Sequence, residues 1–250
     1  MTTTNNTVLV TGGGSGIGFE IARRFHAAGN NIILTGRNEA KLKEAVAQLS
    51  GAEYLVADVT NRAEVANLVI QLTSTYPNLN ILVNNAGKAY KHLLDQAVDT
   101  QALAREEMET NYLAAVHLTD LLLPHLKQQQ EAAIINISSI VGFVPALSIP
   151  TYSASKAALH SYTQALRLTL AGTAPQIRII EVMPPLVDTA FAAALQGDKI
   201  KPRQVADELW TALENNQTEV HVAGTAKLYE LFLQSPAAAA RALNGIKEVI

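Results

Sequence analysis

The sequence contains no cysteine, which excludes disulfide bonds and thiolate chemistry. Its 19 basic and 22 acidic residues leave a net charge of −3, and no basic stripe suggests a nucleic-acid partner. The six histidines lack the HxH and HExxH spacings of zinc sites, so we expect no metal. A disulfide-stabilised scaffold, a nucleic-acid-binding protein and a zinc enzyme are therefore all disfavoured.

Long apolar runs and linker-like segments are also missing. No run approaches the ~20 apolar residues that cross a bilayer. The opening MTTTNNTVLV lacks the basic and apolar regions of a signal peptide. We therefore expect a cytoplasmic protein with no membrane partner. Because no Ser/Gly/Pro-rich stretch or charge run interrupts the chain, residues 1–250 are expected to form a single domain.

Short apolar runs alternate with longer segments of helical periodicity. Two long helices are expected at Glu106–Gln128 and Thr151–Ala171. Continuous apolar strands that alternate with helices indicate a parallel sheet covered on both faces. We therefore expect an α/β fold: one doubly wound Rossmann-type domain with about seven parallel strands, and a helical C-terminal tail at 224–250. The expected strands are Thr7–Val10, Asn31–Thr35, Glu53–Ala57, Asn80–Val83, Ala133–Ile137, Ile177–Val182 and Glu219–Val222.

A glycine-rich segment joins the first expected strand to the first expected helix. Its GxxxGxG spacing has no following GK[ST], so a P-loop NTPase is excluded. Glycine permits tight turns of positive φ and the close approach of a phosphate. The helix N-terminus adds unpaired N–H groups and a partial positive charge. We expect the phosphates of a dinucleotide to be bound here by Gly12, Gly14, Ser15, Gly16, Ile17 and Gly18.

The end of the second expected strand bears on the choice of dinucleotide. An acidic residue at this point binds the 2′-hydroxyl of NAD, whereas an arginine accommodates the 2′-phosphate of NADP. The sequence here is Leu34-Thr35-Gly36-Arg37-Asn38, with no acidic residue at the strand end. Arg37 is placed to pair with a phosphate through its guanidinium group. The sequence therefore predicts NADP(H) as cofactor.

A tyrosine and a lysine lie four residues apart at the start of a long expected helix. Tyr152 and Lys156 therefore share one helical face. A free tyrosine has a pKa of ~10, and a nearby cation favours the phenolate, as proton transfer near neutral pH requires. Ser139 follows the fifth expected strand, where its hydroxyl can reach the same crevice and bind a substrate carbonyl.

Taken together, these motifs resemble the short-chain dehydrogenase/reductase family over essentially the whole chain. The TGxxxGxG loop at Thr11–Gly18 matches the coenzyme loop of that family. Further matches are the adenine-contacting pair Asp58-Val59, the NNAG motif that contains Asn85, Ala86 and Gly87, and the residues Asn111, Ser139, Tyr152 and Lys156.

The resemblance implies a reaction and a role for each matched residue. Hydride moves between the nicotinamide and a substrate carbon, while Tyr152 protonates the forming alkoxide. Lys156 binds the nicotinamide ribose and lowers the tyrosine pKa. Ser139 orients the carbonyl, and Asn111 holds a water that links Lys156 to solvent. The cofactor carries the hydride chemistry, and the protein supplies placement and electrostatics.

One loop departs from the family pattern. The family usually has Pro-Gly after the sixth strand, but this chain has Pro184-Pro185. Proline restricts φ and removes an N–H, so we expect a stiffer loop. Pro184, Val187 and Thr189 remain where cofactor contacts are expected. The Pro-Pro form resembles a bacterial subgroup named after an oxidoreductase of the D-alanyl-lipoteichoic acid operon.

Three segments are expected to line the substrate pocket: residues 89–94, 140–147 and 186–201. Their mostly apolar side chains favour a small apolar carbonyl compound or its alcohol, with Tyr90 and His92 as polar contacts. The alternative is that these side chains only pack the loops. Residues 186–201 are the candidate substrate lid, because closing loops commonly gate turnover.

The two long expected helices carry apolar faces. Family members pair such helices across a dimer axis, so the resemblance implies a homodimer or homotetramer. We favour the homodimer, because the helical tail can block the second interface. The alternative is that these leucines belong to the core: Leu118, Leu121, Leu122, Leu159, Leu166 and Leu170.

Two other functions compete with the oxidoreductase. A catalytically silent NADP(H)-sensing protein on the same fold usually lacks the tyrosine or lysine, and both are present here. A serine hydrolase requires GxSxG after a strand. Gly14-Ser15-Gly16-Ile17 does not provide the last glycine. The substrate, the stereochemistry and the physiological direction stay open.

Overall fold

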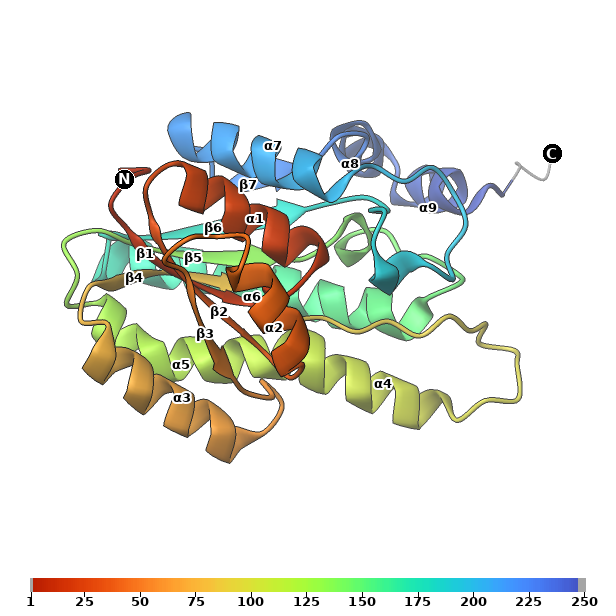
Figure 1. The fold of residues 1–250 in the computed structure, drawn as a ribbon. Coiled ribbons are helices and arrows are strands. Elements are labelled where there is room, and N and C mark those ends of the chain that lie inside the picture. The colour runs from red at the N-terminus through yellow and green to blue at the C-terminus, as the bar shows by residue number, and fades with distance from the viewer. Residues whose placement is uncertain (1, 247–250) are drawn as a thin grey trace.

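The structure, a computed structural model, describes residues 2–246. Its centre is a parallel sheet of seven strands in the order β3-β2-β1-β4-β5-β6-β7 (Figure 1). The strand order reverses between β1 and β4, as in a doubly wound Rossmann fold. The predicted fold class is therefore confirmed. The strands are β1 (Thr7–Thr11), β2 (Asn31–Gly36), β3 (Glu53–Val56), β4 (Leu79–Asn84), β5 (Ala132–Ile137), β6 (Ile177–Met183) and β7 (Glu219–His221).

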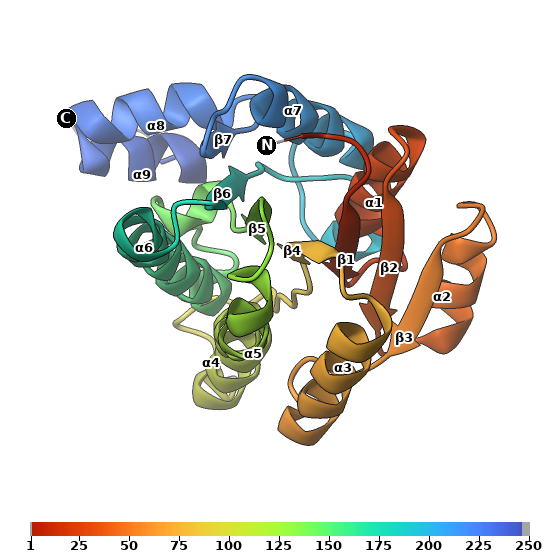
Figure 2. The same ribbon diagram turned by 90° about the vertical axis from the view of Figure 1, so that its left-hand side faces the viewer.

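Helices cover both faces of the sheet (Figure 2). The helices α1 (Gly16–Ala27), α2 (Glu39–Val46) and α7 (Pro202–Glu214) pack on one face. The opposite face is covered by α3 (Arg62–Thr75), α5 (Ala114–Leu126) and α6 (Pro150–Thr173). Alternate residues of a strand feed the two apolar cores, because successive side chains point to opposite faces. In β1, Val8 and Val10 enter one core and Leu9 enters the other.

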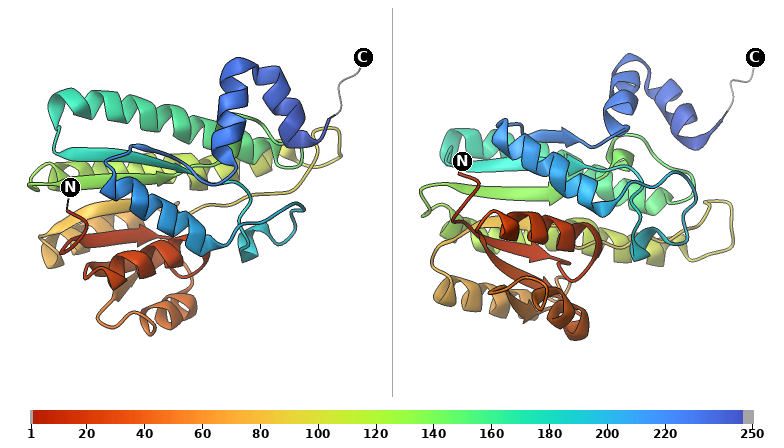
Figure 3. Two further views of the ribbon diagram at one scale, coloured as in Figure 1. Left: turned by 90° about the horizontal axis from the view of Figure 1, so that it is seen from above. Right: turned by 45° about the horizontal axis from the view of Figure 1, so that its top comes forward.

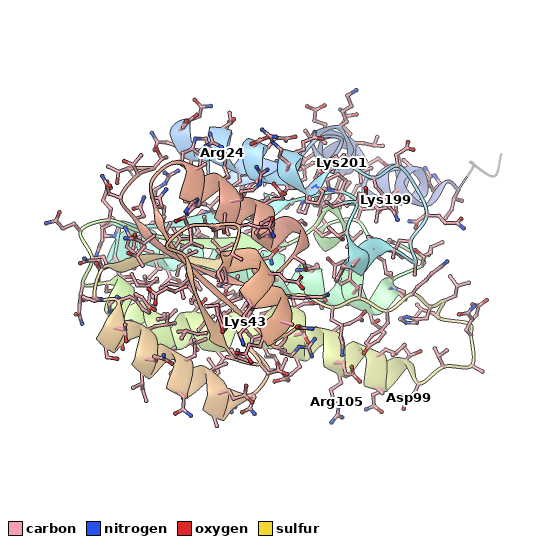
Figure 4. The ribbon with its side chains drawn as sticks, viewed as in Figure 1. Arg24, Lys43, Asp99, Arg105, Lys199 and Lys201 are labelled. Carbon is pink, nitrogen blue, oxygen red and sulfur yellow. The ribbon has the colours of Figure 1, made fainter. Side chains whose placement is uncertain are left out.

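The first long helix differs from the prediction. It begins as α4 (Thr100–Met108), passes through a π-helical turn η1 (Glu109–Leu113) and continues as α5. The predicted start at Glu106 is wrong because the Asp99 side chain, labelled in Figure 4, caps the helix by accepting a hydrogen bond from Ala102 N at 3.0 Å. Asn111 lies within this π-turn and is buried.

The expected helical tail is present as two helices, α8 (Thr225–Gln234) and α9 (Pro236–Asn244), shown in dark blue in Figure 3. Ser235 separates them and caps α9, because its hydroxyl accepts a hydrogen bond from Ala238 N. Residues 247–250 of the expected tail lie outside the described residues. Between residues 2 and 246, no helix has the length and apolar character needed to span a membrane.

Candidate active site

A cavity of about 950 Å³ opens at the carboxyl ends of the strands, where the fold is expected to bind ligands. The glycine-rich loop before α1 forms one part of its wall, and the first turns of α6 form another. Most of the site residues predicted from the sequence meet here. They are Gly12, Ser15, Gly16, Ile17, Asn85, Ala86, Gly87, Ser139, Tyr152, Lys156, Pro184, Val187 and Thr189.

The other predicted site residues lie outside this lining. Gly14 and Gly18 belong to the glycine-rich segment but pack against protein atoms: Gly14 faces Lys41, and Gly18 faces Asn85. A Cβ on Gly18 would collide with the Asn85 side chain and would lie 2.7 Å from Gly12 O. The remaining residues follow β2 and β3 or lie in the π-turn: Arg37, Asp58, Val59 and Asn111.

The glycine-rich loop is held open by backbone conformation and by the neighbouring NNAG segment. Gly12 and Gly16 have φ values of +63° and +59°, which favour glycine. Thr11 Oγ1 accepts hydrogen bonds from Asn85 N at 2.9 Å and Ala86 N at 3.0 Å. The Ser15 side chain makes no capping bond to α1. The first N–H groups of α1 are thus not satisfied by the cap residue, as an anion-binding helix terminus requires.

Tyr152 and Lys156 lie one turn apart on α6 and are buried, with 8% and 3% exposure. Lys156 Nζ donates a hydrogen bond to Ile137 O at 2.7 Å and lies 5.6 Å from the centre of the Tyr152 ring. Ser139 lies two residues beyond β5 and lines the same cavity, where its hydroxyl donates a hydrogen bond to Pro184 O at 3.4 Å. A hydroxyl, a phenol and an ammonium group therefore belong to residues that line one cavity.

Burial governs the charge of both ionisable groups. It raises the pKa of Tyr152 above the ordinary value, while the hydrogen bond from Ser139 opposes this rise. Burial also lowers the pKa of Lys156 to about 8, and the negative charge of Glu181 opposes this shift. Tyr152 is thus a protonated phenol at neutral pH, which is the form that can donate a proton.

Asn111 is fastened between two elements and does not line the cavity. Its Nδ2 donates to Lys88 O and to Ser155 Oγ, each at 2.8 Å. Its Oδ1 accepts a hydrogen bond from Lys88 N at 2.8 Å. Both side-chain N–H donors are therefore occupied by protein partners. This arrangement ties the segment after β4 to α6 directly behind Tyr152 and Lys156.

Arg37 lies at the end of β2, beyond the cavity lining. Its side chain is 66% exposed, and its guanidinium group lies 3.8 Å from Asp58 Oδ2. Asp58 also accepts hydrogen bonds from Thr60 N at 2.9 Å and Thr60 Oγ1 at 2.8 Å. The structure therefore brings together the two residues that the sequence assigned to the adenosine end of a dinucleotide.

The candidate lid, residues 186–201, forms a closed loop over the cavity. A bridge joins Val187 to Ile200, and Asp188 N donates to Ile200 O at 2.8 Å. Between these ends the 3-10 turn η3 (Ala190–Ala192) places the Phe191 ring 5.7 Å from the Tyr152 ring. Two lysines of this region, Lys199 and Lys201, are labelled in Figure 4.

We call the part of the cavity lined by Ile140, Val141, Phe191 and Leu195 its candidate substrate end, or substrate end for short. These side chains are apolar, but the lining of this end differs from the prediction. Of residues 89–94, all of which the structure describes, Leu93 alone lines the cavity. Tyr90 instead hydrogen-bonds Glu106 through its hydroxyl, and His92 is buried beside Tyr90 O. Neither Tyr90 nor His92 therefore lines the cavity, and their contact with a substrate stays a prediction.

Two residues of the C-terminal tail line the same end of the cavity: Leu243 and Asn244. Leu243, like Leu195 of the candidate lid, packs against the apolar cluster that contains Tyr152. The sequence carried no signal for this contact, because it joins residues far apart along the chain.

Comparisons with known proteins agree with this geometry. A sequence model of the short chain dehydrogenase family matches residues 6–199. The chain is 43% identical over 191 residues to the uncharacterised oxidoreductase DltE of Bacillus subtilis (strain 168), across 76% of this chain and 75% of that protein. The expected resemblance to this bacterial subgroup is confirmed.

Two solved structures are also similar. A short chain dehydrogenase from Burkholderia cenocepacia in complex with NADP has a TM-score of 0.85 and 29% identity, over 97% of this chain and 98% of that one. A short chain dehydrogenase/reductase from Burkholderia phymatum in complex with NAD has a TM-score of 0.82 and 20% identity, over 100% and 99% of the chains, and shows likeness of fold alone. The chain therefore belongs to the short chain dehydrogenase family of oxidoreductases.

Proposed function

We propose that the protein is an NADP(H)-dependent carbonyl reductase or alcohol dehydrogenase in which Tyr152 is the general acid and base. The observation that carries this proposal is the convergence of Ser139, Tyr152 and Lys156 in one cavity with the glycine-rich loop. Proton transfer requires a donor within reach of the reacting oxygen, and buried donors in a cleft meet that requirement.

The loop residues fit a dinucleotide. A positive φ at Gly12 and Gly16 and the uncapped start of α1 leave room and N–H groups for a diphosphate. A side chain at Gly16 would lie 3.2 Å from Thr189 and would narrow this cradle. NADP(H) supplies the hydride when it is bound. Lys156 would hold the nicotinamide ribose, and Val187 and Thr189 the carboxamide end.

The protein's own groups account for the proton. Ser139 orients the substrate carbonyl from the wall of the cavity that it shares with Tyr152. During reduction Tyr152 gives its proton to the new alkoxide oxygen, and Lys156 stabilises the phenolate that remains. A water is expected to link Lys156 to solvent. Because both N–H donors of the Asn111 side chain are occupied, we propose that main-chain groups of the π-turn bind this water.

The preference for NADP(H) rests on Arg37. Its exposed guanidinium group is free to turn from Asp58 toward a 2′-phosphate. The adenine would lie against Asp58 and Val59. Residues 186–201 would act as the lid, with Phe191 pressing the substrate toward Tyr152. The apolar lining favours a carbonyl compound with an apolar substituent.

We further propose a homodimer, as the family resemblance implies. Four of the six leucines considered for its interface are buried within the chain, which favours the core alternative for them: Leu118, Leu122, Leu159 and Leu170. Leu168 on α6 is 79% exposed and is available to a second copy. A monomer mass in size-exclusion chromatography with light scattering would refute the dimer.

The test of the function is NADPH oxidation with a panel of apolar ketones, aldehydes and diketones. Tyr152→Phe should abolish turnover while NADPH still binds. Tyr162→Phe is the matched control, because Tyr162 lies on the same helix and packs on Tyr112. Equal turnover by Tyr152→Phe and the wild type would overturn the assignment. Tight NADPH binding without turnover of any compound would favour the silent NADP(H)-sensing protein.

A further inference from the structure

A fully buried carboxylate lies behind the candidate active site. Glu181 of β6 has no exposed surface. Ser138 Oγ donates a hydrogen bond to its Oε1 at 2.5 Å, and His160 Nδ1 lies 2.9 Å from Oε1 and 3.0 Å from Oε2. A buried charge is costly unless it is paired and hydrogen-bonded. The proposed proton transfer leaves this group without a role.

The position of Glu181 relates it to Lys156 in two ways. His160 lies one turn beyond Lys156 on α6, so Tyr152, Lys156 and His160 occupy one helical face at i, i+4 and i+8. In addition, Lys156 Nζ binds Ile137 O, and the next residue, Ser138, binds Glu181.

The cluster of serine, glutamate and histidine is not a hydrolytic triad. The Ser138 hydroxyl donates to the carboxylate of Glu181 and not to the imidazole of His160, so the histidine is not placed to remove the serine proton. His160 binds the same carboxylate from the other side and turns its Nε2 toward Gln164 Nε2 at 3.2 Å. The carboxylate is thus the centre of the cluster: it binds the partly exposed His160, and it binds Ser138, the residue after the one whose carbonyl accepts from Lys156.

We propose that Glu181 is the buried counter-charge of Lys156, and that protonation of His160 controls how strongly Glu181 acts on that lysine. A neutral His160 leaves the carboxylate charge to Lys156. A protonated His160 neutralises the carboxylate and removes this support. Glu181 and His160 are positioning residues here, since they act through Lys156, and the inference rests on the proposed role of Lys156.

The other charged groups around the pair are consistent with this role. His160 also faces Glu219 of β7 and Arg167 of its own helix, and these two bind each other at 2.7 Å. His221 faces Glu181 from β7 and stacks on Tyr229 with 4.3 Å between ring centres. The hydrogen bond with Glu181 is the main cause that raises the pKa of His160.

The direct test is a pH titration of side-chain NMR signals in protein with isotope-labelled lysine and histidine. The Lys156 signal is assigned with Lys156→Met, and the His160 signal with His160→Gln. In Glu181→Gln, the midpoint of Lys156 should fall by about one pH unit, as expected for loss of a nearby opposite charge. Glu219→Gln is the matched control, because Glu219 is the strand partner of Glu181 and should leave Lys156 unchanged.

An unchanged Lys156 midpoint in Glu181→Gln would overturn the proposal. Glu181→Asp keeps the charge and should retain most of the wild-type midpoint, which provides a second variant if the glutamine form does not fold. The titration needs no substrate, so its failure is distinct from a failure of the proposed function.

Kinetics provide a second readout. The basic limb of kcat/KM for ketone reduction should move to lower pH in Glu181→Gln, because Lys156 loses its charge earlier. A uniform loss of kcat at every pH would instead show a merely structural role and contradict the proposal.

Discussion

Asn244, the last residue of α9, binds the main chain of Leu147 although 97 residues separate them. Its Oδ1 accepts a hydrogen bond from Leu147 N at 2.8 Å, and its Nδ2 donates to Pro145 O at 2.9 Å. The C-terminal tail is therefore hydrogen-bonded to residues 145–147, and Leu147 lines the substrate end of the cavity. Asn244 lies beyond residues 6–199, the stretch that the family model matches.

Asn244→Ala should loosen this wall. Loss of the bonds to Pro145 and Leu147 should lower the free energy of unfolding by about 1–2 kcal/mol, which urea denaturation measures. The KM for a ketone should rise severalfold while the affinity for NADPH stays the same. Leu233→Ala, on the exposed side of α8, is the control and should change neither quantity. An equal loss of NADPH affinity in Asn244→Ala would contradict a role confined to the substrate end.

Leu243 should set the size of the accepted substrate. The leucine packs against the apolar cluster that contains Tyr152 and lines the cavity, so Leu243→Ala should enlarge this end of the cavity. We expect kcat/KM to rise for ketones with longer alkyl chains relative to acetone-sized ones, and to fall in Leu243→Trp. If the ratio of kcat/KM for longer ketones to kcat/KM for acetone-sized ketones is the same in the wild type and both variants, α9 does not contact substrate.

Arg37→Asp should reverse the choice of coenzyme. Charge-assisted hydrogen bonds contribute about 1.5–3 kcal/mol, so kcat/KM with NADPH relative to NADH should fall by roughly tenfold or more. The new carboxylate beside Asp58 also repels a 2′-phosphate. Arg105→Asp, on the exposed surface of α4 (Figure 4), is the matched charge reversal and should leave the ratio unchanged.

His160 should stabilise the fold in a pH-dependent way. Its pKa is raised in the folded state by Glu181, so its contribution is fully present below about pH 6.5, the ordinary pKa, and is lost as pH rises through the folded value. The difference in unfolding free energy between the wild type and His160→Gln should therefore shrink with rising pH. In the Glu181→Gln background the pH dependence of that difference should disappear. A difference that grows with pH would refute the pairing.

Much of the fold and the site could be predicted because the signals are local. The strands from β1 to β7 are apolar runs whose alternation with helices needs no knowledge of distant contacts. The spacing of Tyr152 and Lys156 guarantees a shared helical face. The glycines of the loop before α1 are required by backbone conformation alone, as the positive φ of Gly12 confirms.

The errors arose where partners come from other elements. The π-turn at Asn111 depends on bonds to Lys88 and to Ser155 of α6, which no periodicity reveals. The place of His92 outside the cavity lining also involves a distant segment, because its main-chain N donates a hydrogen bond to Ser148 O at 3.0 Å.

The sequence by itself determined the doubly wound sheet, the dinucleotide loop and the tyrosine–lysine pair, because local periodicity and short spacing encode each of them. Only the tertiary structure decided that Glu181 meets His160 behind Lys156 and that Asn244 closes the substrate end. Those contacts join residues 21 and 97 positions apart, and their geometry follows from how the strands and helices pack.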